Sequence, residues 1–238
     1  MIEAHLLRLR KRDVIGAEEE RAIRALVSET RRIKAHHTLI HKAQVLEHSI
    51  LLIDGWLGRA VDRRSGVRSI TEIHVPGDFA DLHGFTLKRL DHDVLALAES
   101  IVALVPHERL TKLTKDFPHL TRIYWFGTNV DAAIHRQWIV SIGRTALARM
   151  AHLFCELFVR LEVVAKTTGS SFDFPLTQDQ LASCLSLTPV HVNRTLQTLR
   201  SDRLIELSNR RLTILDLRGL QAVSEFDPSY LYLERQPA

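Results

Sequence analysis

The strongest constraint on the fold lies near the C-terminus, in the stretch "LTPVHVNRTLQTLR" of residues 187–200. Thr188 can cap a helix through its hydroxyl, and Pro189 suits the first helical position, where no backbone N–H is needed. Apolar side chains then recur at helical spacing, at Val192, Leu196 and Leu199. The pattern predicts a short helix that begins at Pro189, buries one face and presents polar side chains to a partner.

A second predicted helix precedes this one in "LTQDQLASCLSL", where Thr177 and Gln180 have the spacing of a capping box. After the two helices, "LIELSNRRLTILDL" predicts two short strands around a turn at Ser208 and Asn209. Two helices, a tight turn and a two-stranded wing are typical of a winged helix-turn-helix. The alternative is an ordinary helical hairpin that exposes polar residues only for solubility.

The rest of the chain predicts two further parts. Between residues 38 and 106, short apolar runs separated by Gly, Asp, Pro and Ser predict a compact β-domain, and "DVIGAEEERAIRALVSETRRIK" before it predicts an amphipathic helix. A stripe at near-heptad spacing then predicts a long helix that pairs with a second copy: Leu120, Ile123, Val130, Ile134 and Trp138. Gly143 interrupts this helix, so we expect the interdomain hinge there; "KTTGSSFDFP" further on has the composition of a loop.

Composition excludes several classes of protein. With 238 residues, 45% of them hydrophobic, the chain can bury one or two cores. No apolar run approaches the roughly 20 residues that span a bilayer, and the start "MIEAHLLRLRKRDV" lacks the features of a secretory signal, so we expect a cytoplasmic protein with no membrane partner. The net charge of +4 favours anionic partners such as nucleic acid.

Cysteine chemistry is limited to two residues. Cys155 and Cys184 are the only cysteines, and each lies in an apolar helical pattern that predicts a buried thiol. Neither a disulfide framework nor a cysteine-rich iron–sulfur site can be built from them.

These motifs resemble the Crp–Fnr family of bacterial transcription regulators. "LTQDQLASCLSLTPVHVNRTLQTLRSDRLIEL" with "NRRLTILDLRGL" is similar to the family's DNA-binding domain, "GWLGRAVDRRSGVRSITEIHVPGDF" to its sensory β-roll, and "GRTALARMAHLFCEL" to the helix after its hinge. The resemblance implies an α+β fold in three parts. These are an N-terminal double-stranded β-helix (β-roll) over residues 1–118, a dimerisation helix over 119–142, and a C-terminal winged helix-turn-helix domain over 143–238.

The resemblance also implies a function. It implies a homodimer, not an enzyme, that recognises a palindromic promoter site in double-stranded DNA, with RNA polymerase as a further partner and no cofactor. Val190, Asn193 and Arg194 match positions that meet base edges in the family. The positions that hold backbone phosphates match Thr177, Gln178, Thr188 and His191. The chemistry of Arg194 agrees with a base contact, because an arginine can donate two hydrogen bonds to guanine. Val190 departs from the family pattern, since many relatives have a glutamate at this position.

The sensory part departs from the members that bind cyclic AMP. Those members hold the ribose with a Gly-Glu pair and the cyclic phosphate with an Arg-Ser or Arg-Thr pair. Here Asp81 and Leu82 stand at the first pair and Leu90 and Asp91 at the second, with Arg89 displaced by one residue. A carboxylate repels a phosphate, and a shift of one residue on a strand reverses the side-chain direction. We therefore expect no tight binding of cyclic AMP, and the sequence leaves the effector unknown.

Histidines support a rival interpretation. Of the thirteen histidines, six are considered as possible ligands. Four are grouped in "HHTLIHKAQVLEH" and two flank the "PGDF" turn: His36, His37, His41, His48, His74 and His83. Imidazole is a common metal ligand, so a cupin-like, histidine-ligated metal enzyme with a structural helical extension is the alternative function. Because no ligand spacing repeats, and no nucleophile–base pair or phosphate-cradling glycine loop is evident, we expect scattered histidines and no metal site.

Overall fold

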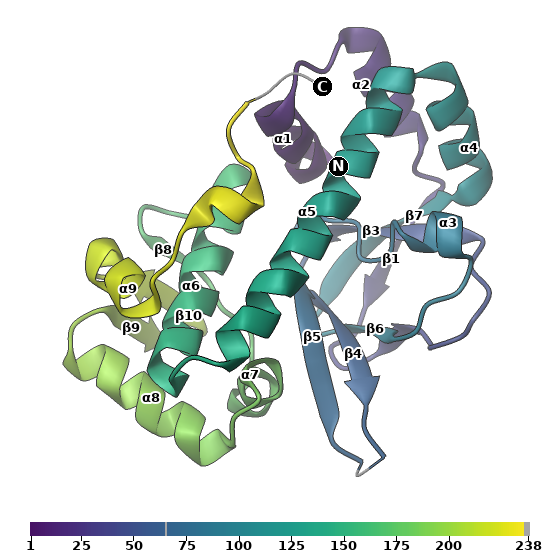
Figure 1. The fold of residues 1–238 in the computed structure, drawn as a ribbon. Helices are drawn as coiled ribbons and strands as arrows, with labels where there is room; N and C mark the ends of the chain where they lie inside the picture. Colours follow the sequence, from purple (N-terminus) through teal and green to yellow (C-terminus); the bar gives the residue numbers. More distant parts are fainter. Residues whose placement is uncertain (65, 236–238) are drawn as a thin grey trace.

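A computed structural model describes residues 1–64 and 66–235. The β-strands of the N-terminal domain gather on one side of the molecule and the C-terminal helices on the other, with one long helix running between them (Figure 1). The α+β fold class is confirmed.

Two antiparallel sheets form the N-terminal domain. The first has the order β1 (Glu29–Ile33), β7 (Ser100–Pro106), β3 (His48–Asp54). The second has the order β2 (Thr38–Ile40), β6 (Asp93–Ala96), β4 (Leu57–Asp62), β5 (Arg68–His74). In β3, Ile50 and Leu52 enter the core between the sheets, whereas Leu51 points to the opposite face. This alternation explains why β3 is apolar along its whole middle: both of its faces are covered.

Helices cover the outer face of the three-stranded sheet: α1 (Glu3–Arg12), α2 (Ala17–Ala25), α4 (His107–Asp116) and the first half of α5 (Pro118–Ile142). The predicted amphipathic helix ends at Ala25, and residues 29–33, which the sequence placed in the same helical segment, form strand β1 instead. Gly77 allows α1 to pack closely, because it has φ +94° and a Cβ there would lie 2.8 Å from the Ala4 backbone.

Helix α5 exists as predicted, but the stripe assigned to dimerisation is wrong. Leu120, Ile123, Val130 and Ile134 are at most 6% exposed within the single chain, and Trp138 packs against the same core. These side chains face the chain's own sheets and helices. The outward face of α5 instead carries Trp125 and Ile139, 67% and 68% exposed.

The C-terminal part is built on helix α6 (Ala146–Val163), which Thr145 caps by accepting a hydrogen bond from the Ala148 N–H. Around it lie α7 (Gln178–Leu185), α8 (Pro189–Ser201), α9 (Leu217–Ser224) and a short 3₁₀ helix, η1 (Pro228–Leu231). Strands β9 (Ile205–Ser208) and β10 (Arg211–Ile214) form the predicted wing. A third strand, β8 (Ser171–Asp173), joins β10 within the segment that the sequence predicted to be loop.

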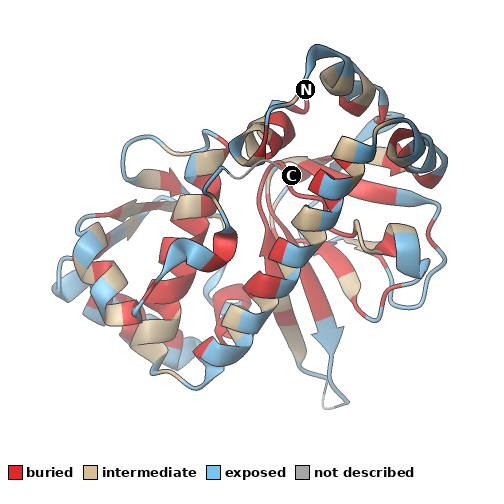
Figure 2. Cartoon of the chain, turned by 45° about the horizontal axis from the view of Figure 1, so that its top comes forward, coloured by how far each residue is buried: buried red, intermediate tan, exposed pale blue. Residues whose placement is uncertain are grey.

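One hydrophobic core runs from the four-stranded sheet into the C-terminal part. Buried residues form a band that passes from the strands through α5 into α6 (Figure 2). Trp56 of the β-domain packs edge-on against Phe174, 5.7 Å between ring centroids, and Gln180 of α7 donates to the Leu97 carbonyl at 2.9 Å. Residue 143 therefore separates helices rather than cores, and the division of the chain into domains there stays a prediction.

None of the helices in the described part of the chain combines the length and the apolar character that crossing a bilayer requires.

Candidate nucleic-acid interface

Both helices of the helix-turn-helix begin at the caps that the sequence predicts. The Thr188 hydroxyl accepts a hydrogen bond from the His191 N–H at 3.2 Å, and Pro189 occupies the first turn of α8. At α7, the Thr177 hydroxyl accepts from the Gln180 N–H while the Gln180 amide oxygen accepts from the Thr177 N–H. These caps fix where each helix starts, and the start of α8 directs unpaired N–H groups to the surface.

The sharp turn between the helices depends on Ser186, which adopts the left-handed conformation at φ 52°. Arg149 of α6 donates to the Leu185 carbonyl at 2.7 Å and so closes the C-terminal end of α7. The turn is therefore held from outside the motif, by a residue for which the sequence pattern gives no signal.

The faces of α8 divide as predicted. Val192, Leu196 and Leu199 are at most 3% exposed and pack into the core. All seven residues assigned to DNA binding are exposed: Thr177, Gln178, Thr188, Val190, His191, Asn193 and Arg194. Val190 is 67% exposed, which leaves its side chain available for contact with a partner.

Arg194 lies at the centre of this surface. Within residues 1–64 and 66–235, its guanidinium has neither a hydrogen-bond partner nor an ion-pair partner. The five N–H donors of this planar guanidinium therefore have no acceptor in the described chain. Such a group suits the bidentate recognition of a guanine edge or a phosphate.

The wing differs from the prediction by one residue. Ser208 pairs with Arg211, so the turn consists of Asn209 and Arg210, with φ 49° and 57°. Two positive φ values define the type I′ turn that matches the twist of a hairpin. The turn places Arg210 at the wing tip, and Arg200 of α8 fixes the wing by donating to the Leu207 carbonyl at 3.0 Å.

In the N-terminal β-domain, the residues at the positions expected to bind a cyclic nucleotide serve the fold. Asp81 is buried and accepts a hydrogen bond from the Ile50 N–H at 2.6 Å; burial raises the pKa of this carboxyl to about 7. Leu90 belongs to the core between the sheets. Arg89 lies at the surface and donates to the Ala43 carbonyl, while exposed Asp91 pairs with His92 at 2.7 Å.

An internal ionic cluster lies where the four-stranded sheet faces α5. Arg59 of β4 is 3% exposed and pairs with Glu72 at 2.5 Å and with Asp131 of α5 at 3.3 Å. His135 of α5 also contacts Glu72, at 3.1 Å. Burial raises the pKa of Glu72 to about 8, although the Arg59 charge opposes that shift. Arg59, a buried arginine of the β-domain, is thus engaged by Glu72 and Asp131, and sequence reasoning did not identify it.

The histidines do not form a metal centre. His36, His37, His41 and His48 are exposed, His74 is buried, and His83 is half-buried. In the part of the chain that the structure describes, no group of three or more His, Cys, Asp or Glu side chains is arranged to hold a metal ion. Of the two cysteines, Cys155 is buried and Cys184 is half-buried, and burial raises the pKa of both thiols.

Comparison with known proteins agrees with this architecture. Residues 148–223 match the model of the Crp-like helix-turn-helix domain. The transcriptional activator FnrL of Cereibacter sphaeroides is 24% identical over 83% of this chain and 80% of its own. FnrA of Stutzerimonas stutzeri, also a transcriptional activator, is 22% identical over 88% and 86%. The structure of FixK2 from Bradyrhizobium japonicum aligns with a TM-score of 0.74 at 19% identity, over 85% of this chain and all of that one.

The fold and the helix-turn-helix define a DNA-binding regulator with an N-terminal antiparallel β-domain. More particularly, residues 148–223 form a Crp-like helix-turn-helix domain, and most of the chain is similar in sequence and fold to transcription regulators of the Crp–Fnr family. It is a regulator and not an enzyme, so the cupin-like alternative is not supported.

Proposed function

We propose that the protein acts as a homodimer on a palindromic promoter site in the bacterial cytoplasm, where it also contacts RNA polymerase. The observation that carries this proposal is the surface of α7 and α8. Seven exposed residues lie at the capped start of α7 and along the first turns of α8, and the Arg194 guanidinium has no hydrogen-bond or ion-pair partner in the described chain. A protein surface that leaves an arginine unsatisfied and presents helix N–H groups is suited to DNA.

Within this surface, Arg194 contacts a guanine through two hydrogen bonds, and Asn193 and Val190 meet neighbouring base edges. Val190 can offer only apolar contact, for example to a thymine methyl. Thr177, Gln178, Thr188 and His191 lie at or near the helix starts and contact phosphates. The wing tip at Arg210 reaches the flanking backbone.

The dimer forms through the outward face of α5. Exposed residues recur there at alternating intervals of three and four: Arg122, Trp125, Asn129, Ala132, Arg136 and Ile139. This spacing is the heptad pattern of a helix pair, with Trp125, Ala132 and Ile139 repeating every seven residues. A second copy of α5 would cover the exposed Trp125 and Ile139 side chains.

The sensory domain works without cyclic AMP in this proposal. Asp81 and Leu90 serve the core, Arg89 points to the surface, and the Arg59 guanidinium is held by Glu72 and Asp131. A cyclic phosphate would therefore meet no available cation at the position the family uses. Calorimetric titration should give no binding of cyclic AMP at micromolar concentration; a micromolar or tighter constant would contradict this part.

The proposed function is tested by selecting bound fragments from randomised duplex DNA with the purified protein. We expect a two-fold symmetric consensus and a complex with two protein chains for each duplex. An asymmetric consensus or a single bound chain would contradict the palindromic dimer, and recovery of no preferred sequence would contradict specific DNA recognition.

A further inference from the structure

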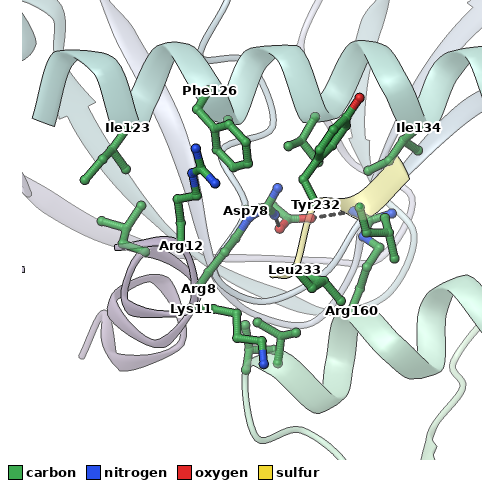
Figure 3. Close-up of a pocket in the computed structure, with 16 residues that line it drawn as sticks. Arg8, Lys11, Arg12, Asp78, Ile123, Phe126, Ile134, Arg160, Tyr232 and Leu233 are labelled. Atoms are coloured by element: carbon green, nitrogen blue, oxygen red, sulfur yellow. Dashed lines mark hydrogen bonds and ion pairs between the residues drawn. The ribbon is translucent and has the colours of Figure 1, made fainter. Parts of the chain in front are cut away.

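A cavity of about 70 Å³ lies where α1, α5, α6 and the segment after η1 meet (Figure 3). It adjoins the ionic cluster around Arg59, because Arg8 in its wall lies 3.9 Å from Asp131 of that cluster. Its α5 lining residues, which include Phe126, Gly127 and Val130, do not include Asp131 or His135. Its walls come from both the sensory part and the DNA-binding part of the chain. Such a volume holds about five water molecules at roughly 10–15 Å³ each.

The interior of the cavity is apolar. Ile123, Val130 and Ile134 of α5, with Leu231 of η1, are each at most 6% exposed and form its floor. Phe126 lines one side, and its ring packs edge-on against Tyr232, 6.2 Å between centroids. Aliphatic and aromatic walls favour the transfer of an apolar group from water.

The rim of the cavity is cationic. Arg8 and Arg160 both pair with Asp78, and Arg160 also pairs with Glu156 at 3.0 Å, so these two arginines are compensated. Arg12 and Lys11 have no acidic partner among the described residues. The Arg12 guanidinium lies 4.2 Å from the centre of the Phe126 ring, and its Nε is buried without a hydrogen-bond partner. Two uncompensated cations thus border an apolar hollow.

We propose that this cavity binds a small amphipathic anion, a monocarboxylate with an apolar chain of about five carbons. The chain fills the hollow between α5 and α6, and the carboxylate accepts hydrogen bonds from Arg12 with Lys11 nearby. An anionic head is favoured over a neutral one, because a charge-assisted hydrogen bond from Arg12 to a carboxylate is stronger than a hydrogen bond to a neutral acceptor. The inference does not depend on DNA binding, so its failure would leave the proposed function intact.

Calorimetric titration with hexanoate tests the site, with hexanamide and acetate as probes that lack the charge or the chain. We expect hexanoate to bind and both other probes to bind at least about tenfold more weakly. Hexanamide loses the charge-assisted hydrogen bond, and acetate loses the burial of four methylenes; each loss corresponds to more than about tenfold in affinity. Absence of binding by hexanoate at millimolar concentration, or equal binding of hexanamide, would overturn the proposal.

Two pairs of variants locate the site. Arg12→Gln should weaken hexanoate about tenfold or more, whereas Arg21→Gln, an exposed control on α2, should leave the affinity unchanged. A Cβ added at Gly127 would meet no atom within 4 Å, so substitution there is sterically allowed. Gly127→Leu should abolish binding by filling the hollow, whereas Gly127→Ala should retain it. If Gly127→Leu and Arg12→Gln both bind like wild type, the ligand lies elsewhere and the proposal fails.

Discussion

Arg194 is the residue on which specificity is expected to depend. Its guanidinium is exposed and has no partner in the described chain, so truncation removes no contact within the fold. Arg194→Ala should therefore fold normally, lose about 1–3 kcal/mol of binding energy per half-site, and relax the preference at one symmetric pair of bases. The measurement is a randomised-operator selection with wild type and variant at fixed salt.

The matched comparison is His191→Ala at the start of the same helix. A phosphate contact carries no base preference, so this variant should weaken binding to specific and unrelated DNA alike. An unchanged base preference in Arg194→Ala would remove Arg194 from this role and make Asn193 or the wing residue Arg210 the better candidate.

His5 makes stability depend on pH. Its Nδ1–H donates to the Gly77 carbonyl and its Nε2 accepts from the Tyr124 hydroxyl, and burial lowers its pKa to about 4. The unfolded chain binds this proton at about pH 6.5, so stability is lost as the pH falls from 6.5 towards 4. Between pH 7 and pH 5 the loss from this residue should be about 2 kcal/mol.

The check is urea unfolding of wild type and His5→Gln at both pH values. Glutamine can donate to Gly77 and accept from Tyr124 without titrating, so the variant should lose about 2 kcal/mol less than wild type on acidification. Comparing the two proteins cancels the opposite effects of Asp81 and Glu72, whose pKa values are raised. Equal losses would show that His5 is not the titrating group.

Among the elements, α5 has two apolar faces with different roles. Ile139 is 68% exposed whereas Ile134 is 1% exposed, although both are isoleucines on one helix. Ile139→Asp should leave the chain folded and split the proposed dimer, because a charge buried in that interface would cost several kcal/mol. Ile134→Asp should unfold the chain instead. Light scattering at micromolar concentration, with circular dichroism as the control for folding, separates the two.

A dimeric Ile139→Asp protein would show that the outward face of α5 is not the interface.

The two faces of α5 also show where sequence reasoning reaches its limit. The caps at Thr177 and Thr188 are local signals, since each depends on residues three positions apart, and both were predicted correctly. A heptad pattern predicts an apolar helix face, but it does not show whether that face packs against the same chain or against a second copy. The stripe from Leu120 to Trp138 was assigned to a second chain, although the chain's own sheets cover it. The partner of an apolar face is a property of the tertiary fold.

Short strands were missed for a similar reason. Strands β1 and β8 have sequences rich in charged or small polar residues, and only their pairing with β7 and β10 makes them strands. The buried ionic cluster around Arg59 also escaped prediction, because its members come from β4, β5 and α5 and share no spacing in the sequence.

At the scale of the whole molecule, Arg160 joins the two halves of the chain. From α6 it donates to Asp78 at 2.7 Å and to the Ile73 carbonyl at 2.9 Å, both in the sensory part, and it pairs with Glu156. Arg160→Met would leave buried carboxylates short of a partner, so we expect a loss of about 3–5 kcal/mol in the free energy of unfolding, measured in urea. Arg203→Met at an exposed position should change it by less than about 0.5 kcal/mol.

A loss below about 1 kcal/mol in Arg160→Met would show that the remaining contacts of Asp78 and Glu156 suffice.

Two contacts tie the C-terminal part to the β-domain, so the two parts are not independent modules. These are the packing of Trp56 against Phe174 and the hydrogen bond from Gln180 to the Leu97 carbonyl. The Gln180 side-chain oxygen accepts from the Thr177 N–H at the start of α7, the first helix of the helix-turn-helix. The Gln180 side-chain nitrogen donates to the Leu97 carbonyl of the β-domain. In an excised C-terminal half, the Phe174 ring would lose its contact with Trp56, and the capping residue Gln180 would lose its hydrogen bond to Leu97. We therefore expect the chain to unfold as one cooperative unit. Grafting its DNA-binding half onto another N-terminal domain should require a replacement for the lost packing partner.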